Sequence, residues 1–552
     1  MDHDGMDRDD QPERRRRDRS GPRRSGPEQS PIDPTPGDAH LNDDAVLRVG
    51  RSRGPVPRDR AFFGHPLGLM TLFGTELWER FSYYGMRAIL LYFLTDTLAN
   101  GGLGLEDDLG NAVVAAYGAS VYLLSVIGGW LADRMIGARR SVLYGGVVIA
   151  AGHVSLAVPS TSTAYLGIVL VALGTGLLKP NVSSMVGDLY SRDDVRRDSG
   201  FSIFYMGINL GSLLAPILVG IAREIGGYHA GFAVAAVGMA IALVFFVAGR
   251  GLLGGAGDEP PNPLTSADRA GVVRLVVAVA AGCVVALGVA ALVSGGFTTT
   301  TLVDALSYIA LAAPVATFWV MFRSPKVTER ERSRLRAYIP LFVAAMLFWM
   351  IFEQAASTLS AYARDHTDLE IFGIEVSPAF FQSVNPASII ILAPVFAWLW
   401  VKLDDRPPTA VKFAIGLTFA ALSFLFLAGA SAVAGDGTSP WWVLVVVYVV
   451  QTIGELCLSP VGLAATTLLA PRAFKGQAMA LWFLATSAGN AITAQLVQVT
   501  SDASPTAYFG GIGAVALVFA GAMFAIAPWV TRHIREGSVT DEADDAAGTV
   551  VH

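Results

Sequence analysis

The stretch from Pro66 to Thr97 reads PLGLMTLFGTELWERFSYYGMRAILLYFLTDT, and it decides the broad class of this protein. As a helix it is long and apolar enough to cross the hydrocarbon core of a bilayer. Its middle nevertheless carries ionisable residues, Glu76, Glu79 and Arg80 among them. Because each such group inside a span costs about 2.5–3.5 kcal/mol on insertion scales, the segment predicts a membrane helix with a functional polar face.

The composition of the whole chain supports a membrane protein. Of its 552 residues, 53% are hydrophobic and 16% are charged, against about 25% charged in soluble domains. A soluble enzyme, a nucleic-acid-binding protein and a disulfide scaffold are therefore excluded. The net charge of −6 offers no basic surface for DNA. The two cysteines, Cys283 and Cys457, lie in apolar runs and are interpreted as buried hydrophobic residues.

Apolar segments of spanning length recur along nearly the entire chain. In lipid they must be helices, because unpaired backbone groups in hydrocarbon cost several kcal/mol each. The predicted fold class is therefore an all-α integral membrane protein with 14 spans. We place them at residues 66–97, 111–133, 140–160, 164–187, 199–221, 229–248, 271–293, 302–322, 338–361, 378–401, 411–432, 441–469, 475–500 and 508–531.

The charges of the connecting loops predict the orientation. One set of loops is rich in Lys and Arg, whereas the other set holds only Arg223 and Arg364. Basic loops remain in the cytoplasm. We therefore expect a multi-pass protein of the bacterial cytoplasmic membrane with both termini cytoplasmic. The basic set comprises residues 133–140, 191–200, 323–336, 401–412, 470–476 and 531–536.

The spans divide into six, two and six. We expect six-helix bundles over residues 61–250 and 337–531, joined by a linker over 251–336 that holds two additional spans. That additional pair contains only Arg274 and Asp304 as charges, near its ends, and is predicted to pack toward lipid. The Pro-, Arg- and acid-rich segment 1–60 is predicted to be a disordered cytoplasmic tail. Residues 532–552 form a second predicted cytoplasmic tail.

The polar residues of the first span share one helical face. At 100° per residue they fall within an arc of about 140°. A purely structural ion-pair network is the alternative interpretation, but two Glu, two Arg and two Tyr exceed what locking helices together needs. The set is Glu76, Glu79, Arg80, Tyr83, Tyr84 and Arg87.

Three further charges lie inside later spans. Lys179 is in the fourth, Glu353 is in the first span of the second half, and Glu455 is in the fourth span of that half. In a two-halved transporter such groups meet near the bilayer midplane. Cations in the first half and anions in the second would suit a zwitterion with a carboxylate and an ammonium. Glu76 and Glu79 are candidates for proton exchange, because burial and a neighbouring cation act on a carboxyl proton in opposite directions.

Three segments resemble a known family. ELWERFSYYG, from Glu76 to Gly85, resembles the ExxERFxYY signature of the proton-dependent oligopeptide transporters. FYMGINLGSL, from Phe204 to Leu213, resembles that family's second signature. GGWLADRMIGARR at 128–140 is similar to the general loop motif of the major facilitator superfamily. The resemblance, which covers about 61–531, implies a major facilitator fold of 6+6 helices with two additional helices between the halves.

The resemblance also implies roles for individual residues. It assigns proton coupling to Glu76, Glu79, Arg80 and Lys179. It implies substrate binding by Arg80, Tyr83, Tyr84, Arg87, Tyr117, Lys179, Asn209, Trp349, Glu353, Asn385, Glu455 and Trp482. We interpret the charges of the loop motif as a gating latch rather than a substrate site. These are Asp133, Arg134, Arg139 and Arg140.

One position departs from the animal members of the family. They carry a histidine beside the tyrosine of the second span, whereas here Gly118 follows Tyr117. Proton coupling would then rest on the carboxylates. His153 and His229 lie elsewhere and are interpreted as interior or boundary residues with satisfied hydrogen bonds.

These features predict a proton-coupled symporter that imports di- and tripeptides by alternating access. We expect no catalytic residue, cofactor or metal, and as partners only protons, small peptides and the lipid bilayer, with a monomer as the working unit. A carrier of nitrate or a peptide-like drug and a non-transporting peptide sensor remain alternatives. A membrane-embedded protease is disfavoured because the chain has no HExxH motif.

Overall fold

The computed structural model describes residues 60–191, 194–403, 406–471 and 474–548. Apart from Arg60, the predicted tail 1–60 lies outside the described residues. The helices are α2 (Leu67–Thr95), α3 (Asp107–Leu131), α4 (Ala138–Ala157), α5 (Thr161–Asp188), α6 (Arg197–Gly249), α7 (Arg269–Val293), α8 (Thr299–Arg323), α9 (Glu329–Phe352), α10 (Thr358–Asp365), α11 (Val384–Leu403), α12 (Thr409–Ala434), α13 (Trp441–Leu469), α14 (Lys475–Val499) and α15 (Pro505–Gly548). A small antiparallel hairpin, β1 (Glu370–Ile371) and β2 (Ile374–Glu375), follows α10.

Two of these helices depart from a simple span. α6 contains Gly227 with φ 76°, which L residues rarely adopt. The chain reverses there, since Gly231 packs against Val219, and α6 therefore supplies two spans. The predicted single span 338–361 is instead broken, because α9 ends at Phe352 and α10 begins at Thr358. Counting α6 twice and α9 with α10 once, the described helices supply the 14 predicted spans.

Local sequence explains where several helices begin. Thr298 and Thr328 cap α8 and α9 through capping boxes. In each, the cap side chain accepts from the main-chain N–H three residues later, and the side chain of that later residue accepts from the main-chain N–H of the cap. Asp107 and Asp108 open α3, where carboxylates favour the positive end of the helix dipole. At the other end of the chain, α15 continues to Gly548, beyond the predicted span end at 531.

Length and composition identify eleven described helices that could each cross a membrane, with α6 counted once. α2 is not among them, although it is 29 residues long. Its four central charges, all on the polar face, depress its hydropathy. A hydropathy criterion alone therefore overlooks the helix that carries most of the candidate site.

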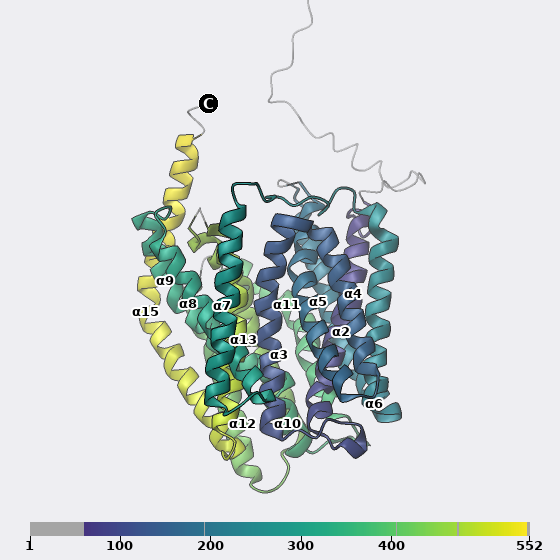
Figure 1. Ribbon diagram of the computed structural model, residues 1–552. Coiled ribbons are helices and arrows are strands. Elements are labelled where there is room, and N and C mark those ends of the chain that lie inside the picture. The colour runs from purple at the N-terminus through teal and green to yellow at the C-terminus, as the bar shows by residue number, and fades with distance from the viewer. Residues whose placement is uncertain (1–59, 192–193, 404–405, 472–473, 549–552) are drawn as a thin grey trace, which may run out of the picture. The chain divides into compact units, whose positions relative to one another are not determined.

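The buried apolar side chains form two large clusters. The first draws mainly on α2 to α6 and includes the fully buried Leu72, Phe93 and Phe232. The second draws on α8 to α15 and includes Phe348 and Phe424. In Figure 1 the first set of helices runs from purple to blue-teal, and the second set runs from teal at α8 and α9 to yellow at α15. Each half of the sequence thus buries its own core, and the halves meet along α3 with α14 and along α6 with α11.

The additional pair, α7 and α8, makes two different kinds of contact. α7 is almost entirely exposed, in agreement with the predicted packing toward lipid. α8 instead packs on both α14 and α3, and a third cluster joins Ala119, Ala310 and Ala491, one residue from each of these helices. Asp304 of α8 is buried and accepts hydrogen bonds from Gln495 and two other residues. The prediction of lipid-facing packing therefore agrees with the exposure of α7 and holds only in part for α8, which covers the seam between the halves with one face and leaves Val315 and Trp319 exposed on another.

Candidate functional site

The polar face of α2 is buried inside the protein. Glu76, Glu79 and Arg80 are each at most 2% exposed. Nε of Arg80 lies 2.8 Å from Oε1 of Glu76 and 2.7 Å from Oε2 of Glu79. Glu79 and Arg80 follow Glu76 by three and four residues, so the three side chains lie on one face of the helix. Within the described residues, Oε2 of Glu76 and Oε1 of Glu79 have no hydrogen-bond partner, so each carboxyl retains a free oxygen.

Tyrosines continue this face toward the next helix. Arg80 lies over the ring of Tyr83, 5.6 Å from its centroid. Tyr83 contacts Tyr84 edge-on at 5.2 Å and stacks with Tyr117 of α3 at 6.3 Å. The hydroxyl of Tyr117 is buried without a hydrogen-bond partner among the described residues. The three predicted tyrosines thus form one aromatic group beside the charges.

Arg87 connects the two halves of the molecule. Its Nη2 donates to both the Oε2 and the main-chain carbonyl of Glu353, which follows directly after α9. Tyr122 of α3 donates to the other carboxylate oxygen of Glu353 at 2.9 Å. Arg87 and Glu353 are 7% and 5% exposed, so the pair is desolvated. Removing one partner from such a pair leaves a buried charge unpaired, which typically costs about 3–5 kcal/mol.

Lys179 approaches this cross-half link from α5. Its Nζ lies 3.9 Å from the ring centroid of Tyr122, a cation–π distance. Tyr122 therefore touches both Lys179 and Glu353. Tyr122 was not among the predicted site residues, although a polar aromatic residue five positions after Tyr117 in an apolar span was the available signal.

The second half contributes Glu455 and Asn385. The amide of Asn385, on α11, donates to Oε2 of Glu455 at 3.1 Å and to the hydroxyl of Thr452 at 2.9 Å. Both Glu455 and Asn385 are only half-buried. Asn209, in the first half, instead donates to the carbonyl of Tyr205 on its own helix. The structure thus joins Asn385 to the predicted charges, whereas the contact of Asn209 is local.

The two predicted tryptophans meet inside the second half. Trp349 and Trp482 contact edge-to-face, with centroids 6.5 Å apart. Gly462 makes room for Trp482, because a Cβ there would lie 2.1 Å from the indole. The indole N–H of Trp349 is buried and has no partner among the described residues. The two indoles thus form a buried aromatic pair that retains an unused donor.

At Gly118, where animal members of the family carry a histidine, the neighbouring space is filled by Asn490 of the second half. A Cβ on Gly118 would lie 2.7 Å from Oδ1 of Asn490, on α14. A larger residue at 118 would therefore displace Asn490. His153 is fully buried, with Nε2 2.6 Å from the hydroxyl of Ser82, but its Nδ1 has no partner among the described residues, so the predicted full set of hydrogen bonds is only half present. His229 contacts the carbonyl of Leu156.

The predicted latch residues contact the segment that follows α6. Arg134 pairs with Asp268 at 3.0 Å, and Arg139 pairs with Asp258 at 2.6 Å. Hydrogen bonds from Thr265, together with Arg134, hold the pKa of Asp268 below its usual value. The predicted residues Asp133 and Arg140 are exposed. These two ion pairs thus tie the loop motif to the segment between α6 and α7.

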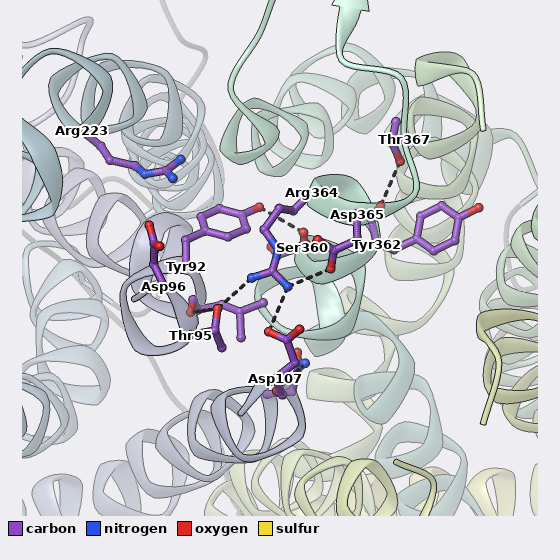
Figure 2. Close-up of polar contacts among 12 residues, drawn as sticks. Tyr92, Thr95, Asp96, Asp107, Arg223, Ser360, Tyr362, Arg364, Asp365 and Thr367 are labelled. Atoms are coloured by element: carbon purple, nitrogen blue, oxygen red, sulfur yellow. Dashed lines mark hydrogen bonds and ion pairs between the residues drawn. The ribbon is translucent and has the colours of Figure 1, made fainter. Parts of the chain in front are cut away.

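A second cross-half network lies at the end opposite the basic loops (Figure 2). Arg364 of α10 donates to the hydroxyl of Thr95 at 2.7 Å and to Asp107 at 2.9 Å. Tyr92 donates to the carbonyl of Ser360 at 3.2 Å. We call Tyr92, Thr95, Asp107, Ser360 and Arg364 the opposite-end network. From the sequence, Arg364 was identified only as a loop charge, and its link from α10 to α2 and α3 was not predicted.

Comparison with known proteins settles the family. The POT family model matches residues 139–515 of the chain. The chain belongs to the POT family. Its relatives in that family include an uncharacterized transporter, YclF of Bacillus subtilis, 48% identical over 503 residues that cover 90% of this chain and 99% of the relative. A di-/tripeptide transporter of Lactococcus lactis subsp. cremoris is 42% identical over 471 residues, covering 83% and 95%.

Solved structures of POT family members agree with the fold. A crystal structure of the peptide transporter POT in complex with sulfate is 52% identical, with a TM-score of 0.81 over 86% of this chain and 97% of that chain. These findings confirm the predicted fold class, an all-α membrane protein of the major facilitator type with two additional helices between its six-helix halves. They also confirm that this POT family member is a multi-pass transport protein.

Proposed function

We propose that this POT family member is a proton-coupled symporter that imports di- and tripeptides by alternating access. The peptide class is supported by the di-/tripeptide transporter to which the chain is 42% identical. The observation that supports the proposal is the contact of Arg87, a cation of the first half, with the Glu353 carboxylate of the second half. Tyr122 is bonded to Glu353, and Lys179 lies over the ring of Tyr122.

The charged groups divide into paired and available ones. Arg80 is held by Glu76 and Glu79, and Arg87 is held by Glu353. Within the described part of the chain, neither Lys179 nor Glu455 forms a salt bridge, and both are only half-buried. We infer that Lys179 receives the carboxylate end of a peptide and that Glu455 receives its ammonium end.

Small peptides share their two ends and differ in their side chains. A site that serves many of them must hold the ends and tolerate the middle. The Trp349–Trp482 pair and the tyrosines Tyr83, Tyr84 and Tyr117 would provide apolar surface of this tolerant kind. In this proposal Asn209 and Asn385 supply amides for the peptide bond.

We assign proton coupling to Glu76, Glu79 and Arg80 of α2 together with Lys179 of α5. The free oxygens of Glu76 and Glu79 can take a proton, and protonation removes the cost of a desolvated charge. Arg80 is shared between these carboxyls, so a proton on either one releases it toward the other. Release of Arg80 would alter its contact with Tyr83 and thereby the neighbouring peptide site.

Alternating access requires that the two ends of the molecule open in turn. We propose that the opposite-end network closes one end and that Asp133, Arg134, Arg139 and Arg140 act at the other.

We also propose a topology and a working unit. Both termini are cytoplasmic, and the membrane is a bacterial cytoplasmic membrane. The functional units are residues 61–250, 251–336 and 337–531, and a single copy of the chain carries out transport.

The decisive experiment is uptake into proteoliposomes that contain the purified full-length protein. Labelled dialanine should accumulate when the outside is acidic, and a protonophore should abolish the accumulation. Counterflow, in which unlabelled dialanine inside exchanges with labelled dialanine outside, should proceed without a pH gradient. Excess nitrate should not compete.

Each alternative gives a different result. Competition by nitrate but not by dipeptides would identify an anion carrier. Binding of dialanine without counterflow would identify a sensor. Accumulation of dialanine that ignores the protonophore would contradict proton coupling while leaving peptide transport intact.

A further inference from the structure

Glu353 lies where the first span of the second half is interrupted. α9 ends at Phe352, residues Glu353–Ala356 form a single 3-10 turn, and α10 starts at Thr358. Between them Ser357 has φ −118° and ψ −103°, which is not helical. The last carbonyls of a helix lack partners within it, and in a membrane interior they must find partners elsewhere.

Side chains from several helices supply those partners. The carbonyl of Met350 accepts from Nε2 of Gln354 at 3.0 Å and from the hydroxyl of Thr493 at 3.2 Å. The carbonyl of Ala355 accepts from Tyr448 at 3.3 Å. The interruption is therefore a built feature, with hydrogen bonds from α13 and α14.

Gln354 spans the interruption itself. It is fully buried, and its Oε1 accepts from the hydroxyls of Thr358, at 2.5 Å, and Tyr508, at 3.0 Å. One amide thus joins the end of α9, the start of α10 and the helix α15. A glutamine side chain can donate to the Met350 carbonyl through its Nε2 while its Oε1 accepts from two hydroxyls, and these contacts use both ends of the amide.

We propose that Gln354 is a positioning residue for Glu353. By bonding to Met350, Thr358 and Tyr508, it holds the 3-10 turn in the geometry that presents both the carboxylate and the carbonyl of Glu353 to Arg87. The proposal rests on the proposed peptide transport function and adds a residue that touches no substrate.

The geometry at Glu353 explains why its position matters. Arg87 bonds two different acceptors of Glu353, and Tyr122 bonds a third. Charge-assisted hydrogen bonds require short, well-directed contacts. A small rotation of the turn would separate these bonds, and Tyr122 would carry the change to Lys179, which lies on its ring.

The test uses full-length protein in proteoliposomes and measures dialanine counterflow together with the melting temperature. Gln354→Met keeps the length of the side chain and removes every hydrogen bond. Tyr508→Phe removes a single bond to the same amide. Gln451→Leu is the matched control, because Gln451 is equally buried but bonds to Ser423 of α12.

The expected result is a KM for dialanine about tenfold higher in Gln354→Met and about threefold higher in Tyr508→Phe, with less than about a twofold change in Gln451→Leu. In a Glu353→Gln background, Gln354→Met should change KM by less than about twofold, because the residue acts through Glu353.

Equal effects of Gln354→Met in both backgrounds would indicate a purely structural role and overturn the inference. A lowered melting temperature of Gln354→Met with an unchanged KM for dialanine, in the wild-type background, would also overturn the inference. If Gln354→Met fails to fold, the same comparison with Tyr508→Phe decides. Lack of dialanine counterflow by the wild-type protein would overturn the proposed function and this inference with it, whereas unchanged variants beside an active wild type overturn the inference alone.

Discussion

α2 and α7 are both membrane helices of similar length, but the burial of each is the reverse of what its polarity would suggest for a soluble protein. α2 carries two Glu and two Arg, yet its polar face and most of its apolar residues are buried inside the protein. α7 is apolar along nearly its whole length, yet only Ala290 is buried, and Val284 is 71% exposed. The more hydrophilic of the two helices is thus the interior one.

The difference follows from the solvent. Lipid chains are as apolar as Leu or Val, so α7 loses nothing by facing them. The charges of α2 can be accommodated only where partners such as Glu353 or water replace the lipid. In a membrane protein of this kind, a spanning helix that carries charges indicates the functional site, whereas a spanning helix that is apolar throughout indicates the periphery.

The largest expected effect comes from the charges around α2. Glu79→Gln and Lys179→Ala should each abolish uptake of dialanine driven by a pH gradient, because each removes one member of the predicted proton-coupling set. Uptake into vesicles with an acidic exterior is the measurement. A variant that still accumulates dialanine would show that its residue has no such role, and wild-type levels of protein in the membrane are the control.

The second effect tests the cross-half pair as a stability element. Arg87→Leu should lower the free energy of unfolding by about 3–5 kcal/mol, because the Glu353 carboxylate stays buried without its cation. The double variant with Glu353→Gln should recover most of that loss. Thermal unfolding in detergent measures both, and additive losses in the double variant would speak against a direct pairing.

The third effect separates the two ends of the peptide. Glu455→Gln should raise the KM for dialanine about tenfold, since an ammonium loses its charged partner. N-acetylated dialanine, which has no ammonium, should be affected by less than about twofold. Competition against labelled peptide gives both values, and an equal loss for both compounds would remove Glu455 from the proposed role.

The smallest effect is expected on α7, and it completes the comparison. Val277→Leu and Val284→Leu should leave dialanine uptake within about twofold of wild type, because both side chains face lipid. Val284→Lys should lower the amount of membrane-inserted protein, since a charge there costs about 2.5–3.5 kcal/mol. A strong loss of uptake in the Leu variants, at normal protein level, would mean that α7 contacts more than lipid.

Much of the fold could be predicted because its cause is local. The positions of the spans follow from runs of apolar residues, and the break at Gly227 fell within the predicted loop between residues 221 and 229. The interruption at Glu353 was not predicted. Its stability depends on hydrogen bonds from Thr493 and Tyr448, which are remote in the sequence.

The candidate site divides in the same way. Helical periodicity was enough to place Glu76, Glu79 and Arg80 on one face, and the structure brings them into contact. Periodicity could not show that Arg87 pairs with a residue 266 positions away, nor that Tyr122 lies between Lys179 and Glu353.

The amino-acid sequence by itself determined that the chain is helical, that it crosses the membrane repeatedly and that one helix carries charges no lipid would accept. Only the tertiary structure decided which charges meet, that α8 covers the seam between the halves, and that Asn490 fills the space beside Gly118. The physical reason is the distance along the sequence over which each effect acts. Hydropathy and helix period act over a few residues, whereas the partners of a buried charge are chosen by the packing of helices from both halves.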